Sequence, residues 1–168
     1  VADTDERIWG AEGNLQFPVA EGWALGGTLA YTRGQYKDAA GDWRELNAFR
    51  VSPFKATVYS DWDFHEGYGV RLQALSVGGN DRAYDDAQSA AVSSSIRATT
   101  AAKIQGYTVA DLITRAPWFG GEIGFGIYNL ANRDYKTVYS QQARATYGAL
   151  SSLSASGRTF ALSCSVGY

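Results

Sequence analysis

The chain has 168 residues, with 15 Lys and Arg against 17 Asp and Glu, which gives a net charge of −2. This balance argues against nucleic acid as a partner, because phosphate binding requires a clustered excess of basic residues. A single Cys cannot form an internal disulfide, and no Cys or His cluster has the spacing of a zinc site. The chain is 45% hydrophobic and 14% aromatic, too rich for a disordered protein, yet no apolar run is long enough for a transmembrane helix. This is the composition of a folded β protein.

Alternation of apolar with polar or small residues predicts seven long strands, and no segment has helical periodicity. In chain order the predicted strands cover residues 9–17, 23–32, 54–64, 68–74, about 105–115, 122–127 and 159–168. In the fifth strand the sequence does not decide which face each side chain occupies. If Asp111 points to water, then Leu112 lies on the other face. Strands of roughly ten residues exceed the usual five or six and suit a tilted membrane crossing.

The predicted connections alternate strictly between short and long. The short ones are 19–22, 65–67 and 117–121, and the long ones are about 33–53, 78–104 and 131–156. Long irregular loops are uncommon in compact soluble domains. Short turns on one side and long loops on the other are typical of an outer-membrane β-barrel, with the turns in the periplasm.

Aromatic residues gather at the short-turn end of the predicted strands. They are Phe17, Trp23, Trp62, Phe64, Tyr68, Trp118, Phe119 and the terminal Tyr168. Aromatic rings favour strands in general, but their clustering at every short turn favours a girdle at the membrane–water boundary.

The predicted strand number is odd, so the two ends of the chain lie on opposite sides of the membrane. Single-chain bacterial barrels have an even number of strands, and unpaired strand edges are costly in lipid. The first residues, Val1 to Glu6, look like a loop, and the sequence shows no starting Met and no visible signal peptide. We therefore expect residues 1–168 to be the C-terminal third of a larger transmembrane barrel.

Several stretches of the chain carry a family resemblance. They are Ile8–Glu12, with a Gly-x-Glu strand opening; Val51–Tyr59, with a Pro and a Tyr in a strand after a long loop; the pair Gly106–Leu112 and Gly126–Tyr135; and Gly157–Leu162 before a terminal aromatic. In this order across nearly the whole chain, they resemble the C-terminal end of a TonB-dependent outer-membrane receptor, a transporter for ferric siderophores, haem or cobalamin. The chain departs from the family pattern at Cys164 and Tyr168, where Leu and Phe are more common. Tyr168 still supplies a terminal aromatic for the assembly signal.

The resemblance implies a multi-pass protein of the bacterial outer membrane that imports a ferric siderophore. In this family a 22-stranded barrel is occluded by a plug, and we expect both the plug and the TonB box to lie outside these 168 residues. The implied partners are the remaining strands and plug of the parent receptor, the ferric siderophore, TonB and outer-membrane lipid. No cofactor is expected, and iron is expected only within the bound siderophore.

No catalytic constellation is visible, so the chain is not expected to be an enzyme. The sole histidine, His65, lies in a short turn near Asp61, Asp63 and Glu66. These side chains could bind a metal or act in acid–base catalysis, but charged residues exposed to water in a turn are the simpler explanation. The acidic stretch 80–86 lacks the spacing of a calcium loop. Cys164 falls on the apolar face of the last strand, as a small hydrophobe would.

Ligand contact is the one function that this segment could share. A ferric siderophore is bulky, polar and frequently anionic, so Arg, Tyr and Trp in the long loops are the candidates. They are Trp43, Arg44, Arg82, Tyr84, Arg97, Tyr139, Arg144 and Tyr147, each of which could instead be an ordinary exposed loop residue. Lys55, Asp61, Arg71 and Asp111 are expected to face the barrel lumen.

Two other functions remain open at this point. A small self-contained outer-membrane barrel, acting as an anchor or adhesin, needs an eighth strand, for which residues 90–96 in the 79–104 loop are a poor candidate. A soluble β-barrel binder with an apolar interior predicts solubility without detergent, and leaves the aromatic ends and the loop asymmetry unexplained.

Overall fold

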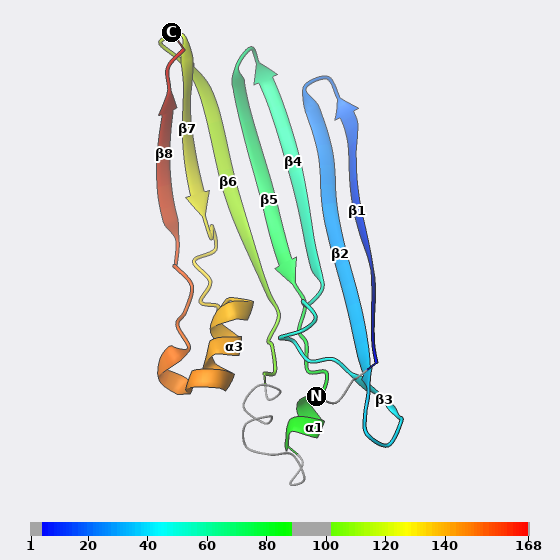
Figure 1. Cartoon of the computed structure of the whole chain (residues 1–168). Coiled ribbons are helices and arrows are strands. Elements are labelled where there is room, and N and C mark those ends of the chain that lie inside the picture. Colours follow the sequence, from blue (N-terminus) through cyan, green and yellow to red (C-terminus); the bar gives the residue numbers. More distant parts are fainter. Residues whose placement is uncertain (1–4, 89–101, 168) are drawn as a thin grey trace.

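The computed structural model describes residues 5–88 and 102–167, and within them the protein is a single antiparallel sheet. Strands pair in the order β1-β2-β4-β5-β6-β7-β8, with β3 added beside β2 (Figure 1). The strands are β1 (Glu6–Ala20), β2 (Trp23–Lys37), β3 (Trp43–Glu45), β4 (Lys55–His65), β5 (Tyr68–Val77), β6 (Tyr107–Trp118), β7 (Gly121–Tyr128) and β8 (Thr159–Ser165). The helices are α1 (Tyr84–Gln88), α3 (Val138–Tyr147) and the 3-10 turn η1 (Ala149–Ser151). The all-β prediction is confirmed.

Short turns and long connections lie at opposite ends of the sheet (Figure 1). Glu21-Gly22, Glu66-Gly67 and Phe119-Gly120 form the short turns. The last of these needs a positive φ at both residues, 44° at Phe119 and 75° at Gly120, and glycine adopts this conformation without strain. The predicted short turns are therefore confirmed, although each is tighter than expected.

The long connections contain regular structure that the sequence did not predict. β2 continues to Lys37, and β3 then pairs with its end, so the first connection is partly strand. The last connection contains the helix α3. The Thr137 hydroxyl caps this helix by accepting from the Ser140 amide at 3.2 Å, and Gly148 ends it at a φ of 93°. Only Val138 and Ala145 of α3 pack against the hydrophobic core, and both stay partly exposed, so the sequence has no broad apolar stripe that could have predicted the helix.

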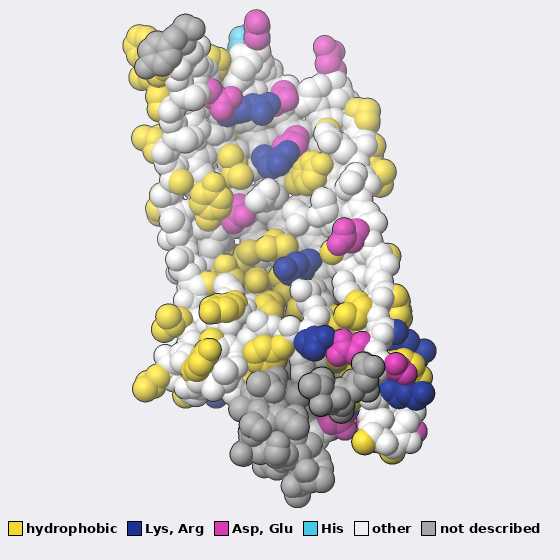
Figure 2. Space-filling model, in the orientation of Figure 1, with side chains coloured by type: hydrophobic (Ala, Val, Ile, Leu, Met, Phe, Trp, Pro, Cys, Tyr) yellow, Lys and Arg dark blue, Asp and Glu magenta, His cyan; other side chains and the backbone are white. Residues whose placement is uncertain are grey.

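The register separates the side chains onto two faces. We call the polar face the one shared by Gln16, Tyr59, Arg71, Gln73 and Asp111, and the apolar face the one shared by Phe17, Leu25, Leu72, Leu112, Ile127 and Phe160. Asp111 accepts from Gln73 Nε2 at 3.0 Å, which confirms that Asp111 and Leu112 lie on opposite faces. Charged side chains run down the middle of the face seen in Figure 2.

The apolar face is exposed along its length. Leu15, Val58, Leu72 and Leu162 are 65%, 61%, 48% and 73% exposed. From Trp23 to Tyr31, β2 spans nine residues, roughly 26 Å of strand. At the tilt of about 40° that strands have in outer-membrane barrels, this section covers roughly 20 Å, most of their apolar band of about 25 Å, which is edged by aromatic residues. The face is therefore suited to contact with lipid.

The buried hydrophobic residues lie in the long connections and at the ends of β5 and β6 that adjoin them. They are Leu46, Ala48, Val51, Val77, Ala102, Ile104 and Val109. Gly34 allows this packing, because a Cβ there would lie 2.7 Å from Leu46 Cδ1 and 2.8 Å from Val51 Cγ2. This small core fixes the connections against the end of the sheet, and so it positions the surface described next.

Candidate ligand-binding surface at the loop end

Four of the predicted ligand residues line one pocket. Trp43 and Arg44 come from β3, and Arg82 and Tyr84 come from the connection after β5. The pocket has a volume of about 500 Å³. Lys103 also lines it, and its Nζ lies 5.5 Å from the centre of the Tyr84 ring. The fold thus brings together residues that are about 40 positions apart in the sequence.

Arg44 is held in this pocket by a carboxylate. Asp38 accepts from the backbone amides of Ala40 and Asp42, each at 2.9 Å, and from Arg44 Nε at 3.0 Å. The Asp42 amide and the Arg44 guanidinium hold the pKa of Asp38 below its usual value. The lining itself contains the four carboxylates of Glu45, Asp81, Asp85 and Asp86 against three basic side chains, so this pocket is not matched to an anion.

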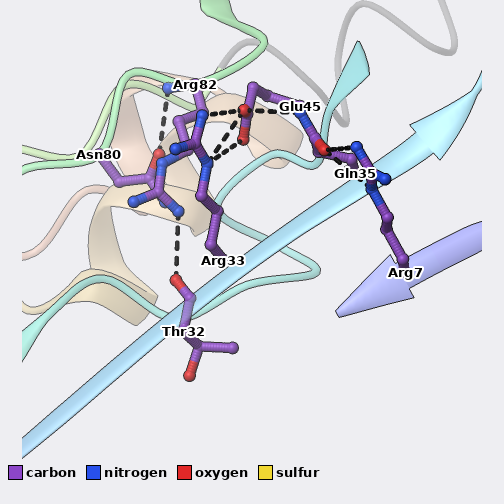
Figure 3. Close-up of polar contacts among 7 residues, drawn as sticks. All are labelled: Arg7, Thr32, Arg33, Gln35, Glu45, Asn80 and Arg82. Atoms are coloured by element: carbon purple, nitrogen blue, oxygen red, sulfur yellow. Dashed lines mark hydrogen bonds and ion pairs between the residues drawn. The ribbon is translucent and has the colours of Figure 1, made fainter. Parts of the chain in front are cut away.

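Arg82 has a structural role in the same region. Its Nη1 donates to the Thr32 carbonyl at 3.2 Å, and its backbone amide donates to Asn80 Oδ1 at 3.0 Å (Figure 3). Asn80 is 5% exposed, and its Nδ2 donates to the Val51 carbonyl at 3.4 Å. Arg82 therefore ties the connection after β5 to β2, whether or not it also contacts a ligand.

A second pocket has a volume of about 370 Å³, and most of its charged side chains are basic. Its lining includes Lys103, Arg133, Lys136 and Arg144, opposed by the single carboxylate of Asp134. Tyr107 and Tyr135 also line it, with their ring centres 4.6 Å apart. Four cations beside two phenols form a surface suited to a bulky anionic ligand.

A buried asparagine positions this basic pocket. Asn129 is 5% exposed and follows β7 with a φ of 52°. Its Oδ1 accepts from the Arg133 amide at 2.8 Å, and its Nδ2 donates to the carbonyls of Arg133 and Ser156 at 2.8 and 3.2 Å. Its own amide donates to Asp111 Oδ1 at 2.9 Å. Asn129 thus fixes the turn from which Arg133 to Lys136 enter the pocket.

Glutamine side chains dock α3 beside the pocket. Gln141 Oε1 accepts from the Gln105 amide at 2.7 Å, and Gln141 Nε2 donates to the carbonyls of Gln105 and Lys136, both at 3.0 Å. Gln142 Nε2 donates to the Ala48 carbonyl at 2.7 Å. These contacts bring Arg144 to the pocket across more than 35 residues of sequence.

The other predicted residues lie apart from both pockets. Tyr139 lines a separate hollow of about 240 Å³ with Leu153, and Tyr147 is 76% exposed. Arg97 lies outside the described residues. Sequence reasoning missed Lys103, Tyr107, Arg133, Tyr135 and Lys136, although most of them stand inside or beside the family motifs, where they could have been considered as site residues.

The polar face carries ion pairs near the short turns. Arg71 donates from Nε and Nη2 to both oxygens of Asp61, at 2.6 and 2.5 Å, and Arg115 pairs with Asp63. Tyr59 lies against Gly26, since a Cβ at that glycine would be 2.4 Å from the Tyr59 Cζ and Oη atoms. The ion pair between Arg71 and Asp61 agrees with the expectation that these two side chains share the inward face.

In the described part of the chain, no group of three or more His, Cys, Asp or Glu side chains is placed to hold a metal ion. No helix within the described ranges is long and apolar enough to cross a membrane.

No family model matches the chain. The ferric aerobactin receptors of Escherichia coli and Klebsiella pneumoniae are each 30% identical to it over 99% of its length. The rhizobactin receptor of Rhizobium meliloti is 26% identical over 97%. The chain spans about a fifth of these relatives, 21% of the aerobactin receptors and 20% of the rhizobactin receptor.

Among solved structures, the copper transporter OprC matches with a TM-score of 0.68. The match covers 94% of this chain and 23% of the transporter at 19% identity, which shows a common fold. The resemblance read from the motifs is confirmed: over nearly its whole length the chain is similar to ferric siderophore receptors of the TonB-dependent family, in a segment that folds as antiparallel barrel wall.

Proposed function

We propose that the chain forms part of the barrel of a TonB-dependent outer-membrane receptor that imports a ferric siderophore. The observation that supports this proposal is the basic pocket at the loop end, which is lined by Lys103, Arg133, Lys136 and Arg144 together with two tyrosines. A bulky anionic iron complex would be held there by charge-assisted hydrogen bonds and by aromatic contact. The iron is cargo within the siderophore, not a resident cofactor.

The proposal also assigns the other surfaces of the sheet. In the described sheet, β1 pairs only with β2 and β8 pairs only with β7, which leaves two open edges. The remaining barrel strands would pair with these edges, because unpaired strand edges are costly in lipid. The plug would contact the polar face, and TonB would act through a segment outside these residues.

The two alternatives have less support. A self-contained small barrel requires β1 to meet β8, but these strands stand at opposite ends of the described sheet (Figure 1). The candidate eighth strand, 90–96, lies outside the described residues. A soluble binder would leave Leu15, Val58 and Leu162 more than half exposed to water. Relatives named as receptors and a fold shared with a transporter also favour a role other than catalysis.

Uptake of radiolabelled iron by cells under iron limitation tests the proposal, with ferric aerobactin and ferric rhizobactin as the first probes. Deletion of the gene should abolish uptake of one of them, and the full-length protein should restore it. Replacing Arg133 and Lys136 together with Gln should raise the half-saturating concentration about 100-fold or more, since hydrogen bonds to charged groups contribute about 1.5–3 kcal/mol each and 1.4 kcal/mol is tenfold.

Arg158→Gln is the matched control, because this exposed arginine is at the loop end but does not line the pocket. Uptake that survives deletion for every ferric siderophore supplied would contradict the proposed function. Uptake that requires the gene but is unchanged in the double variant would contradict only the assignment of the pocket.

A further inference from the structure

The helix α3 presents a row of exposed side chains that neither pocket at the loop end uses. Tyr139, Ala143 and Tyr147 are spaced by four residues, so they lie along one face of the helix. The opposite face is the one that docks, because Val138 and Ala145 pack against the buried core. Tyr139 and Tyr147 are 78% and 76% exposed. Two faces of α3 are therefore suited to packing, and only one of them is covered within the described residues.

A hollow of about 240 Å³ lies beside the exposed face. It is lined by Tyr139 of α3 and by Leu153 and Ala155 of the segment before β8. Its described lining has no charged side chain, so it is not matched to the anionic ligand of the basic pocket. The hollow is preformed, because Ser140 Oγ donates to the Leu153 carbonyl and the Ala155 amide donates to the Tyr135 carbonyl at 2.8 Å. An apolar side chain could enter it without rearranging its walls.

Two leucines extend this surface toward the edge of the sheet. Leu150, in η1, and Leu153 are 97% and 70% exposed, and β8 begins at Thr159, six residues after Leu153. Figure 2 shows hydrophobic side chains gathered at the loop end below β7 and β8. We call Tyr139, Tyr147, Leu150 and Leu153 the α3 surface. Single exposed leucines are ordinary, but four large side chains beside one hollow mark an interaction surface.

The open edge of β8 decides what lies next to the α3 surface. In the described sheet β8 pairs only with β7, in a ladder that ends at Tyr128 and Thr159. The segment before β8 stays beside the connection that follows β7, since the Arg158 amide donates to Asn132 Oδ1 at 2.8 Å. The other side of this segment therefore continues the open edge. A strand paired with that edge would run about 4.8 Å from β8, and its loop-end connection would emerge beside residues 150–158.

We propose that the α3 surface holds the loop-end connection of the barrel strand that pairs with β8, and that an apolar or aromatic side chain of this connection fills the hollow. The curated relatives extend well beyond the segment that this chain spans, so they contain further strands of this kind. The proposal rests on the proposed function only in requiring a further barrel strand, and not on siderophore binding.

The size of the α3 surface favours this occupant over a separate partner. A stable interface between two proteins uses roughly 20–30 residues on each side, many more than the α3 surface offers. A connection that strand pairing already holds in place needs far less contact, because its effective concentration is of millimolar order or higher. The α3 surface is therefore sufficient for a connection of the same barrel and too small for a second copy of the protein.

Site-specific photo-crosslinking of the full-length protein tests the proposal. The photoreactive residue p-benzoylphenylalanine replaces Leu150 in cells that make no siderophore, and mass spectrometry identifies the labelled peptide. The same residue at Ala161, within β8, identifies the pairing strand independently. We expect position 150 to label the connection that adjoins this strand in the same polypeptide. Ala39, exposed in the turn between β2 and β3, is the matched control position and should not label that connection.

Two variants measure how strongly the α3 surface holds the connection. Leu150→Gln should speed cleavage of the labelled connection, by a protease added to whole cells, about tenfold. The Leu150→Gln/Leu153→Gln double variant should speed it about 100-fold, because burial of a leucine changes an equilibrium constant by about tenfold or more. Cleavage reports the population of the released connection when release is fast. Ala39→Gln should leave the rate unchanged.

A crosslink to a second copy, to another protein or to no protein would overturn the proposal. A labelled peptide that does not adjoin the strand found from Ala161 would overturn it too, as would an unchanged cleavage rate in the double variant. The crosslink is formed without siderophore, so it can fail in a protein that still imports iron. Conversely, a failed uptake assay would contradict the proposed function while leaving the crosslink in place.

Discussion

Asn129→Ala should release the turn that carries the basic pocket. The substitution removes three side-chain hydrogen bonds, two of them to the backbone of Arg133 and one to that of Ser156. At about 1 kcal/mol each they contribute about 3 kcal/mol. Alanine at a φ of 52° costs a further 1 kcal/mol or so, because its Cβ crowds the backbone in the left-handed region. The turn should lose about 4 kcal/mol of local stability.

Hydrogen exchange at the Arg133 amide measures this loss directly, because that amide donates to Asn129 Oδ1. Asn129→Gly removes the same hydrogen bonds without the backbone strain, and should speed exchange about 100-fold, at tenfold per 1.4 kcal/mol. Asn129→Ala should be about fivefold faster still. Asn129→Asp keeps the acceptor for the Arg133 amide and loses the donor, so it should fall between the wild type and Asn129→Gly.

The stability of β7 and β8 should not change, because the substitution leaves their backbone pairing from Glu122 to Tyr128 intact. Exchange of the β7 amides therefore serves as the internal control. An Arg133 amide that exchanges at the wild-type rate in Asn129→Gly would refute the role assigned to Asn129. Faster exchange throughout β7 would show that the effect is global unfolding and not release of the turn.

Two further predictions concern the membrane face and the first loop. Leu72→Arg, on the apolar face, should cost about 2–4 kcal/mol if the site lies near the bilayer midplane. Gln73→Arg, one residue away on the polar face beside Asp111, should be tolerated, and heat-dependent mobility on gels of the full-length protein compares the two. The hydrogen bonds from Asp42 and Arg44 lower the pKa of Asp38, so they stabilise its charged form in the folded loop. The loop at 38–45 should therefore be fully stable above the ordinary Asp pKa of about 3.9 and should loosen as the pH falls through the lowered value. Exchange of its amides, corrected for the intrinsic rate, should show this, and in Asp38→Asn the loosening should not depend on pH.

The strands could be predicted because period-two alternation is a local signal. Leu72 and Gln73 fall on opposite faces by sequence alone, and the ladder from β4 through β6 places them so. For β6, alternation alone did not show which residues point to the polar face. The hydrogen bond from Gln73 to Asp111 decides this, because it places Asp111 on the polar face. Strand ends were harder, because Arg33, Gln35 and Lys37 extend β2 beyond its apolar section, where alternation no longer carries information.

The loop surface could be predicted only in part. Residue type and position in the predicted loops suggested Trp43, Arg44, Arg82 and Tyr84 as ligand residues, and the fold brings these four together in one pocket. Nothing local shows that Gln141 docks α3 against Gln105, or that Asn129 holds Arg133 and Ser156. These contacts join residues up to 36 positions apart, so the position of Arg144 beside Lys103 follows from the tertiary structure and not from spacing.

The contact of Tyr59 with Gly26 has a consequence for the relief of the polar face. Because the glycine offers no side chain, the phenol ring can lie over β2, where its hydroxyl is 3.3 Å from Gln16 Oε1 and the Arg71 guanidinium is 4.7 Å from its centre. A residue with a Cβ at position 26 would meet the ring at 2.4 Å and would push it away from the strand. The missing side chain at Gly26 therefore keeps the polar face low at this level of the sheet.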